Sequence, residues 1–462
     1  MDDQIYKPTK DLASHIIPTK TKRISWKNSP KQKLEHEFRV FQKSNVHRGV
    51  TFSNNGKFIA SGNNDQTILW DYYSGKRLRS ESTGWWESGR LSFTPDDKFL
   101  IVNIGPEDVS AWNLALGGTD ILLEYQETEI AKEDTIYNTI AFTRDCQFIA
   151  VGSNDSTIEI WKMDSEKWNL LKKLKMHSEI LSIAFSMDGK YFLSASSDKT
   201  LRLWKTSNWK GVWIEKYGNT VNSVSFSPTD NNVFAAGYGD GTVSIWRIPN
   251  PTWYVSNKKP TEILKLSSHL ELGYIEYLAF SPNGKKIGVA SMSKFSLWET
   301  ETGELLHFLE DKEHFTMHNF TFSPNNKILI SIDYVGRLHY WDLITFNLLA
   351  INHQPDSGFL YSIPPDEYFP ESLFWTDRAD LITVYAEKPD GTREVASDKE
   401  RDCYIDTHNR KLLVQPRLCG DLKKYEDLVK SVHMTIEGYN NQIALESKYF
   451  HQIAIEVRNS YE

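Results

Sequence analysis

The sequence predicts an all-β fold in which one four-stranded unit is repeated, and three observations support this prediction. The chain of 462 residues is rich in aromatic side chains, with 15 Trp, 21 Tyr and 23 Phe, which favour strands over helices. A short polar signature recurs seven times after alternating apolar runs. Each copy is followed by a strand, a second polar turn and a strand that ends in tryptophan.

The polar signature indicates a hairpin turn at the start of each unit. It joins a Phe to Ser or Thr and then to residues such as Pro, Asp, Asn and Gly, which tolerate the backbone angles of tight turns. The copies are FSNNGK, FTPDDK, FTRDCQ, FSMDGK, FSPTDN, FSPNGK and FSPNNK, which begin at residues 52, 93, 142, 185, 226, 280 and 322. We therefore expect seven hairpins.

The tryptophans set the length of the repeat. They are Trp70, Trp112, Trp161, Trp204, Trp246, Trp298 and Trp341, and the gaps between them run from 42 to 52 residues. With "ILWD" at 68–71 and "YWD" at 340–342, the pattern closely resembles the WD40 repeat, whose unit of about 40 to 45 residues forms one propeller blade. The resemblance spans residues 46–352 and implies an all-β, WD40-type β-propeller.

The number of blades follows from how the ring closes. A blade cannot bury both faces alone, so neighbours must stack until no edge is exposed. The run "NLLAINH" after Trp341 completes a seventh blade from its own residues. We expect a degenerate eighth blade, with Tyr385 in the tryptophan position, formed by residues 358–363, 372–376, 380–385 and, as its outer strand, 34–41. The alternative is a seven-bladed ring with residues after 353 as a separate appendage.

The chain divides into three parts on this interpretation. Residues 1–32 form a flexible basic tail, residues 33–400 the propeller, and residues 401–462 a small C-terminal α+β extension that packs on it. Within the extension, "DLKKYEDLVKSV" after Gly420 predicts an amphipathic helix, and "HQIAIEV" predicts a strand.

Charge and cysteine content indicate a soluble intracellular protein, cytoplasmic or, as an alternative, nuclear. The net charge of −8 argues against a body that coats nucleic acid, although residues 1–45 carry ten Lys or Arg against five acids. The three cysteines, Cys146, Cys403 and Cys419, form no short-spaced pair and suit a reducing compartment. No apolar run predicts a signal peptide or a membrane span.

The stretch "LSASSDKTLRLWK" contains polar residues that could be mistaken for a catalytic relay. The resemblance implies instead a structural tetrad, formed by His177, Ser194, Asp198 and Trp204. In it an imidazole, a hydroxyl and backbone amides satisfy a buried aspartate, and the indole N–H also finds a partner. The common phosphate-binding, zinc-protease and serine-hydrolase motifs are missing from the sequence, so we expect no enzyme, no cofactor and no metal site.

Irregular stretches between the repeats are the candidates for partner binding. Trp85 and Trp86 are adjacent before the second unit, and Trp253 and Tyr254 lie in a Pro-punctuated insertion, although these rings could also fold back onto the propeller wall. The family geometry implies a narrow end of the ring lined by Arg48, Asn64, Glu87, Asn138, Asn154, Glu179, Ser197, Tyr238, Tyr274, Glu276 and His318.

These features favour a non-catalytic scaffold or recognition subunit of a multiprotein complex, with protein or peptide partners. One alternative is a propeller enzyme or ligand-binding protein with a site in the central channel. Another is a subunit of an RNA- or chromatin-associated complex that uses the basic tail. The partner's identity does not follow from the sequence.

Overall fold

The computed structural model describes only strands and the turns between them. The described residues are 49–62, 66–73, 75–82, 91–104, 108–115, 119–124, 137–164, 167–249, 259–266, 272–291, 294–310, 319–333, 336–353, 360–363, 373–376, 382–387, 393–395 and 452–457. Within these ranges no helix is long and apolar enough to cross a membrane. Most of the strands form seven successive antiparallel units of four, the blades.

The first four blades follow one another along the chain. Blade 1 contains β1 (Gly49–Phe52), β2 (Phe58–Gly62), β3 (Gln66–Asp71) and β4 (Arg77–Ser82). Blade 2 contains β5 (Ser92–Phe93), β6 (Phe99–Ile104), β7 (Asp108–Asn113) and β8 (Thr119–Glu124). Blade 3 contains β9 (Tyr137–Phe142), β10 (Phe148–Ser153), β11 (Thr157–Asp164) and β12 (Lys167–Lys175). Blade 4 contains β13 (Ile180–Phe185), β14 (Tyr191–Ser196), β15 (Thr200–Lys205) and β16 (Lys210–Lys216).

Three further blades complete the set. Blade 5 contains β17 (Val221–Phe226), β18 (Val233–Tyr238), β19 (Val243–Arg247) and β20 (Thr261–Leu266). Blade 6 contains β21 (Ile275–Phe280), β22 (Lys286–Ser291), β23 (Lys294–Glu299) and β24 (Leu305–Glu310). Blade 7 contains β25 (Asn319–Phe322), β26 (Ile328–Ile332), β27 (Leu338–Asp342) and β28 (Leu348–Asn352).

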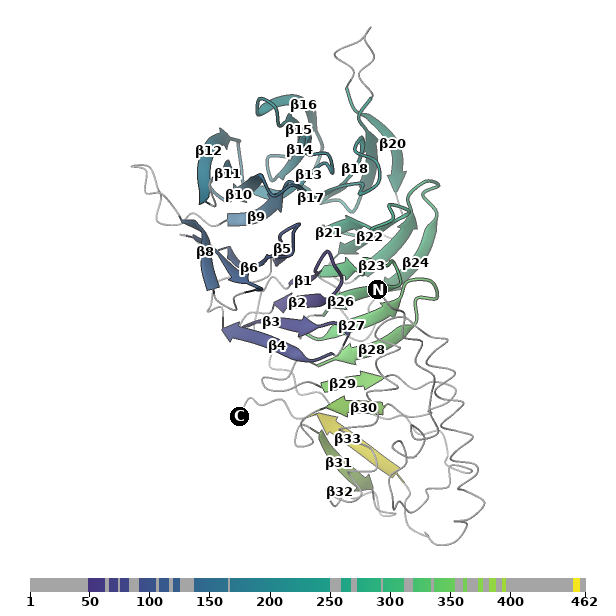
Figure 1. The fold of residues 1–462 in the computed structure, drawn as a ribbon. Helices are drawn as coiled ribbons and strands as arrows, with labels where there is room; N and C mark the ends of the chain where they lie inside the picture. The colour runs from purple at the N-terminus through teal and green to yellow at the C-terminus, as the bar shows by residue number, and fades with distance from the viewer. Residues whose placement is uncertain are drawn as a thin grey trace, which may run out of the picture.

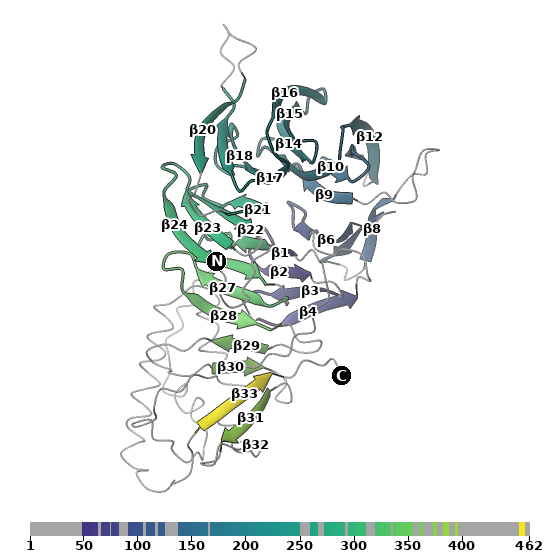
Figure 2. The ribbon, with the colours of Figure 1, turned by 180° about the vertical axis from the view of Figure 1, so that it is seen from behind.

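The blades form a closed ring of seven (Figures 1 and 2). Seven apolar clusters each join two neighbouring blades, and one of them joins blade 7 to blade 1. In that closing cluster, Val50 and Phe52 of β1 are buried together with Ile328 and Tyr340 of blade 7. The first strand of each blade lies innermost, where first strands of neighbouring blades contact one another. The strand β1, for example, packs against β25 and β5.

The expected eighth blade is not part of this ring. Strands do occur near the expected positions, as β29 (Leu360–Ile363), β30 (Leu373–Thr376) and β31 (Ile382–Glu387). However, β29 and β30 extend the sheet of blade 7 outward beyond β28. Because β1 already covers β25, the ring has no gap for another blade, and the extra strands pair with a free outer edge.

The last strands form a separate three-stranded sheet, in which β31 lies between β32 (Arg393–Val395) and β33 (Gln452–Val457). Tyr385 is therefore in β31 of this small sheet, opposite Val395 and Ala454, and not in a blade. The strand β33 is the one that "HQIAIEV" predicts. The expected outer strand 34–41 and the expected helix in "DLKKYEDLVKSV" lie outside the described residues.

The repeated polar signature forms the hairpin between the first and second strand of each blade. In blade 1, Ser53 Oγ accepts a hydrogen bond from Phe58 N at 2.9 Å, and Gly56 has a φ of 69°. The same hydroxyl bond recurs in blade 4, where Ser186 Oγ accepts from Tyr191 N at 3.0 Å. The Ser or Thr of the signature therefore satisfies the backbone of a tight turn, as its composition predicts.

Glycines on second strands let neighbouring blades approach closely. A methyl group added at Gly237 of β18 would lie 2.7 Å from Cγ2 of Ile275 in the next blade. Gly152 meets Ile180 in the same way, and Gly288 meets Phe320. These contacts leave no room for a side chain, because interiors pack to the density of organic crystals.

We predict that Gly237→Ala lowers the free energy of unfolding by about 1–3 kcal/mol, since the added methyl forces Ile275 or the backbone to shift. Urea denaturation measures the change. Gly218→Ala is the matched control, because no atom lies within 4 Å of the position that its methyl would take. Equal stability of the two variants would contradict the close blade contact.

Candidate functional site

Blade 4 brings two residues of the expected tetrad into contact. The Trp204 indole Nε1 donates a hydrogen bond to Ser194 Oγ at 2.9 Å, and both side chains are buried. The same bond recurs in blades 1 and 7, between Trp70 and Ser61 and between Trp341 and Ser331. A buried indole N–H needs an acceptor, so this repeated bond supports the fold.

His177 and Asp198 do not join that bond, so the expected four-residue network is corrected to a pair. Asp198 accepts from Thr200 N at 2.9 Å and forms an ion pair with Arg202 at 3.2 Å. His177 is exposed, and among the described residues it bonds to neither Ser194 nor Asp198. The Arg202 guanidinium supplies the donor that an imidazole would have provided.

Blade 7 contains a buried charged cluster around Asp333. Its carboxylate lies 2.6 Å from Arg337 Nε and 2.9 Å from His339 Nε2, and Asp333 is only 1% exposed. Burial alone would raise the pKa of Asp333, but the hydrogen bond and charge of His339 and the charge of Arg337 outweigh it and lower the pKa below its usual value. These three side chains form an ion network at the turn between β26 and β27, and its role is structural.

A repeated β-bulge shapes one end of the central channel. In blades 3 to 6 the register between the first and second strands skips the second residue of the inner strand. The skipped residues are Asn138, Leu181, Asn222 and Glu276. We name these four residues, with Glu179, Ser197 and Tyr274, the ring mouth. A bulged residue has no partner directly opposite it in the ladder, and the strand bends and twists at that point.

In blades 3, 4 and 5 the residue after the bulge ties neighbouring blades together. Thr139 Oγ1 accepts from Ile183 N at 3.3 Å, Ser182 Oγ from Val224 N at 3.2 Å, and Ser223 Oγ from Leu278 N at 3.1 Å. These bonds cross from one inner strand to the next, so the ring mouth is held on a rigid frame.

Three of the predicted partner-binding residues meet at the ring mouth. Asn138 Nδ2 donates to Glu179 Oε1 at 2.6 Å, which joins blade 3 to the loop before blade 4. Ser197 N donates to the backbone oxygen of the same Glu179 at 3.0 Å. Two further candidates lie before and within β21: Tyr274 is 44% exposed, and Glu276 is the bulged residue of blade 6.

Tyr238 is wrong as a surface candidate. It is fully buried and stacks on Tyr217, with ring centroids 3.8 Å apart. Burial raises its pKa above the usual value. The reason is its place as the last residue of β18, where the ring fills the space between blades 4 and 5.

The remaining candidates divide between one exposed turn and the undescribed residues. Asn154 lies partly exposed in the turn between β10 and β11. Eight candidates lie outside the described residues: Arg48, Asn64, Trp85, Trp86, Glu87, Trp253, Tyr254 and His318.

Sequence reasoning missed two members of the ring mouth, Leu181 and Asn222. Asn222 is 6% exposed, its Nδ2 donates to the backbone oxygen of Ile275 at 3.0 Å, and its Oδ1 has no partner among the described residues. A signal was present, because every bulged residue precedes the Phe of its hairpin signature by four positions. Arg48 and His318 hold the same position in the sequence of blades 1 and 7.

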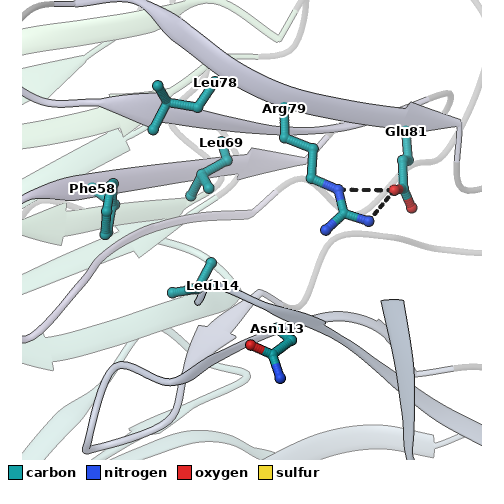
Figure 3. Close-up of a pocket in the computed structure, with 7 residues that line it drawn as sticks. All are labelled: Phe58, Leu69, Leu78, Arg79, Glu81, Asn113 and Leu114. Carbon is teal, nitrogen blue, oxygen red and sulfur yellow. Dashed lines mark hydrogen bonds and ion pairs between the residues drawn. The ribbon is translucent and has the colours of Figure 1, made fainter. Parts of the chain in front are cut away.

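A separate cleft of about 470 Å³ lies between blades 1 and 2 (Figure 3). Its apolar wall consists of Phe58, Leu69, Leu78 and Leu114. Its charged side is neutralised internally, because Arg79 pairs with Glu81 and covers the Trp112 ring at 4.4 Å. The cleft therefore offers mainly apolar contacts. Across the described ranges, no three His, Cys, Asp or Glu side chains are grouped so as to hold a metal ion.

Comparison with known proteins agrees with this architecture. The family model "WD domain, G-beta repeat" matches residues 32–71, 129–162, 168–205 and 213–247. The chain is a WD40-repeat β-propeller. The first match begins before β1, and the others cover blade 3 and parts of blades 4 and 5.

Two known proteins are similar to this WD40 propeller. The small ribosomal subunit protein RACK1 of Drosophila melanogaster is 29% identical over 134 residues, which are 28% of this chain and 38% of that protein. The crystal structure of the Cps50 (Swd1) β-propeller domain from Myceliophteria thermophila is 13% identical with a TM-score of 0.54, and the match covers 66% of this chain and 99% of that domain. The second likeness concerns the fold alone.

We predict that Asp198→Ala lowers the free energy of unfolding of this WD40 propeller by about 2 kcal/mol, because it leaves the largely buried Arg202 guanidinium without its carboxylate partner. His177→Ala changes it by less than about 0.5 kcal/mol, since the side chain is exposed. Thermal and urea unfolding of both variants measure the effects. A large loss in His177→Ala would restore the four-residue tetrad.

Asp333→Asn is expected to destabilise the protein at pH 7 and to do so less in acid. A carboxyl whose folded-state pKa is lowered stabilises the fold above its unfolded-state pKa of about 3.9 and loses this contribution as the pH falls. The difference in unfolding free energy between wild type and variant should therefore narrow below about pH 4. A difference that stays constant from neutral to acid pH would contradict the ionised cluster.

Proposed function

We propose that this WD40 propeller is a non-catalytic recognition subunit of a multiprotein complex, and that it binds a protein or peptide partner at the ring mouth. The main support for this proposal is the repeated bulge, which places Asn138, Leu181, Asn222 and Glu276 at equivalent positions of four consecutive blades. A surface built by repetition on a rigid frame offers preformed contacts at low entropic cost.

The chemistry of the ring mouth favours a partner with hydrogen-bond donors and positive charge. Glu179 and Glu276 supply carboxylates, and the Asn138 amide holds the Glu179 carboxylate in place. Tyr274 adds an exposed aromatic ring beside Ile275, and such rings are frequent anchors of protein interfaces. A Lys- or Arg-bearing loop or peptide fits these groups better than a nucleic acid, whose phosphates the carboxylates would repel.

The comparisons support the coarse part of the proposal. RACK1 is by its name a ribosomal subunit protein. From this similarity we infer for the present protein only that it belongs to a larger assembly. The match spans well under half of that protein, so its particular partners are not transferred.

The test compares tagged wild type with a Glu179→Gln, Glu276→Gln double variant by affinity purification from the native cells. Glutamine keeps the shape and the acceptor for Asn138 but removes the charge, so we expect partners to be lost while the melting temperature stays the same. Glu301→Gln, in the exposed turn between β23 and β24 at the other end of the blade, is the control and should retain them.

Retention of all partners by the double variant would exclude the ring mouth as their site. Purification of a small molecule in place of a protein partner would favour a ligand-binding or enzymatic propeller.

A further inference from the structure

A second repeated bulge lies on the outer wall of the ring. In six blades the register between the third and fourth strands shifts by one residue beside the repeat tryptophan. The residue skipped on the outer strand is aliphatic in every case: Leu78, Leu171, Val212, Ile263, Leu306 and Leu349. Four of them, Leu78, Leu171, Val212 and Ile263, are between 46% and 51% exposed.

Blade 7 shows what such an outer edge can bind. Its outer strand β28 is not an edge, because β29 pairs with it antiparallel through Ile351 to Ser362 and Asn352 to Tyr361. The outer edge of a blade in this propeller is thus able to accept one more strand. Its bulged residue, Leu349, is 3% exposed.

Blade 4 presents the equivalent edge with no strand on it. Among the described residues its sheet ends at β16, so one row of backbone N–H and C=O groups along β16 faces outward. Ile214 of β16 pairs with Arg202 as Ile351 of β28 pairs with His339, which makes the two edges equivalent in register. Both ribbon views place β16 at the periphery, and Figure 1 shows it away from the inner strand β13 (Figures 1 and 2).

The exposed side chains distinguish β16 from the other outer strands. Val212 and Ile214 are each 51% exposed, and within the described residues no other strand exposes two large aliphatic side chains. An unpaired edge with exposed aliphatic residues is a template for strand addition.

Charge at the two ends of β16 favours a different chain over a second copy of this protein. Lys210 and Lys216 are both exposed. If two copies paired antiparallel about Trp213, Lys210 of each would face Lys216 of the other, and like charges directly opposite are destabilising. A strand with an acidic residue at each end would instead form two favourable cross-strand pairs.

From these observations we infer that β16 binds an extended segment of a partner protein by strand addition. The segment pairs antiparallel over about seven residues, as long as β16 itself, with aliphatic side chains at alternate positions over Val212 and Ile214 and an acidic residue at each end. This surface is distinct from the ring mouth, so one propeller could hold two partners at once.

The test uses the full-length protein and a synthetic peptide of sequence DTVTVTE. Antiparallel pairing places its two valines opposite Ile214 and Val212 and its acidic ends opposite Lys216 and Lys210. We expect calorimetry to detect binding of the peptide, and hydrogen exchange at the β16 amides to slow when it is bound. A Val212→Thr, Ile214→Thr variant should bind with an affinity about tenfold or more lower, because threonine keeps strand propensity but removes apolar contact. Ile263→Thr, on the outer strand of blade 5, is the matched control and should bind as wild type does. The peptide KTVTVTK should bind more weakly.

Several outcomes would overturn the inference. They are no binding of DTVTVTE, equal binding by the Thr variant of β16, or binding without protection of the β16 amides. A dimer in sedimentation that is lost in the Thr variant would assign the edge to a second copy of this chain instead. The Glu179→Gln, Glu276→Gln variant should bind the peptide normally, so failure at the ring mouth and failure at β16 can be told apart.

Discussion

Each blade has two apolar faces that it cannot cover alone, and this constraint organises the ring. Every described cluster of core residues lies between two blades, and the one between blades 7 and 1 closes the circle. Glycines on the second strands permit this close contact, since a side chain at Gly152, Gly237 or Gly288 would collide with the next blade. Removal of any blade would expose two interfaces.

Closure of the ring also explains the features at its two surfaces. On the inside, the strands converge. In blades 3 to 6 a bulge near the start of the inner strand takes one residue out of the ladder, and in blades 3 to 5 the next residue bonds to the neighbouring blade. On the outside, the strands diverge, and a bulge beside the tryptophan leaves an aliphatic side chain on the wall. Bulges bend and twist strands, so the same device serves the narrow and the wide side of each blade.

Polar groups in the blades serve the fold in more than one arrangement. Trp204 bonds to Ser194, whereas Trp112 donates to Glu81 of the preceding blade and Trp161 to Glu159 of its own strand. Asp198 and Asp333 each bind an arginine four residues later. A buried donor or carboxylate must have a partner, but several side chains are able to provide it, which accounts for the divergence among the blades.

The sequence by itself determined the repeat, the hairpin signatures and the strands that end in tryptophan, because turn chemistry and apolar alternation are local. The number of blades was decided only by tertiary structure: strands near 360 and 374 were predictable, but whether they form a blade depends on whether β1 already covers β25. Likewise, Asn138 and Glu179 could be named from the sequence, whereas the burial of Tyr238 and the exposure of His177 depend on neighbouring blades. Asn138 meets Glu179, 41 positions further along the chain, and Tyr238 meets Tyr217, which follows the outer strand of the preceding blade. No pattern local to either residue specifies these contacts.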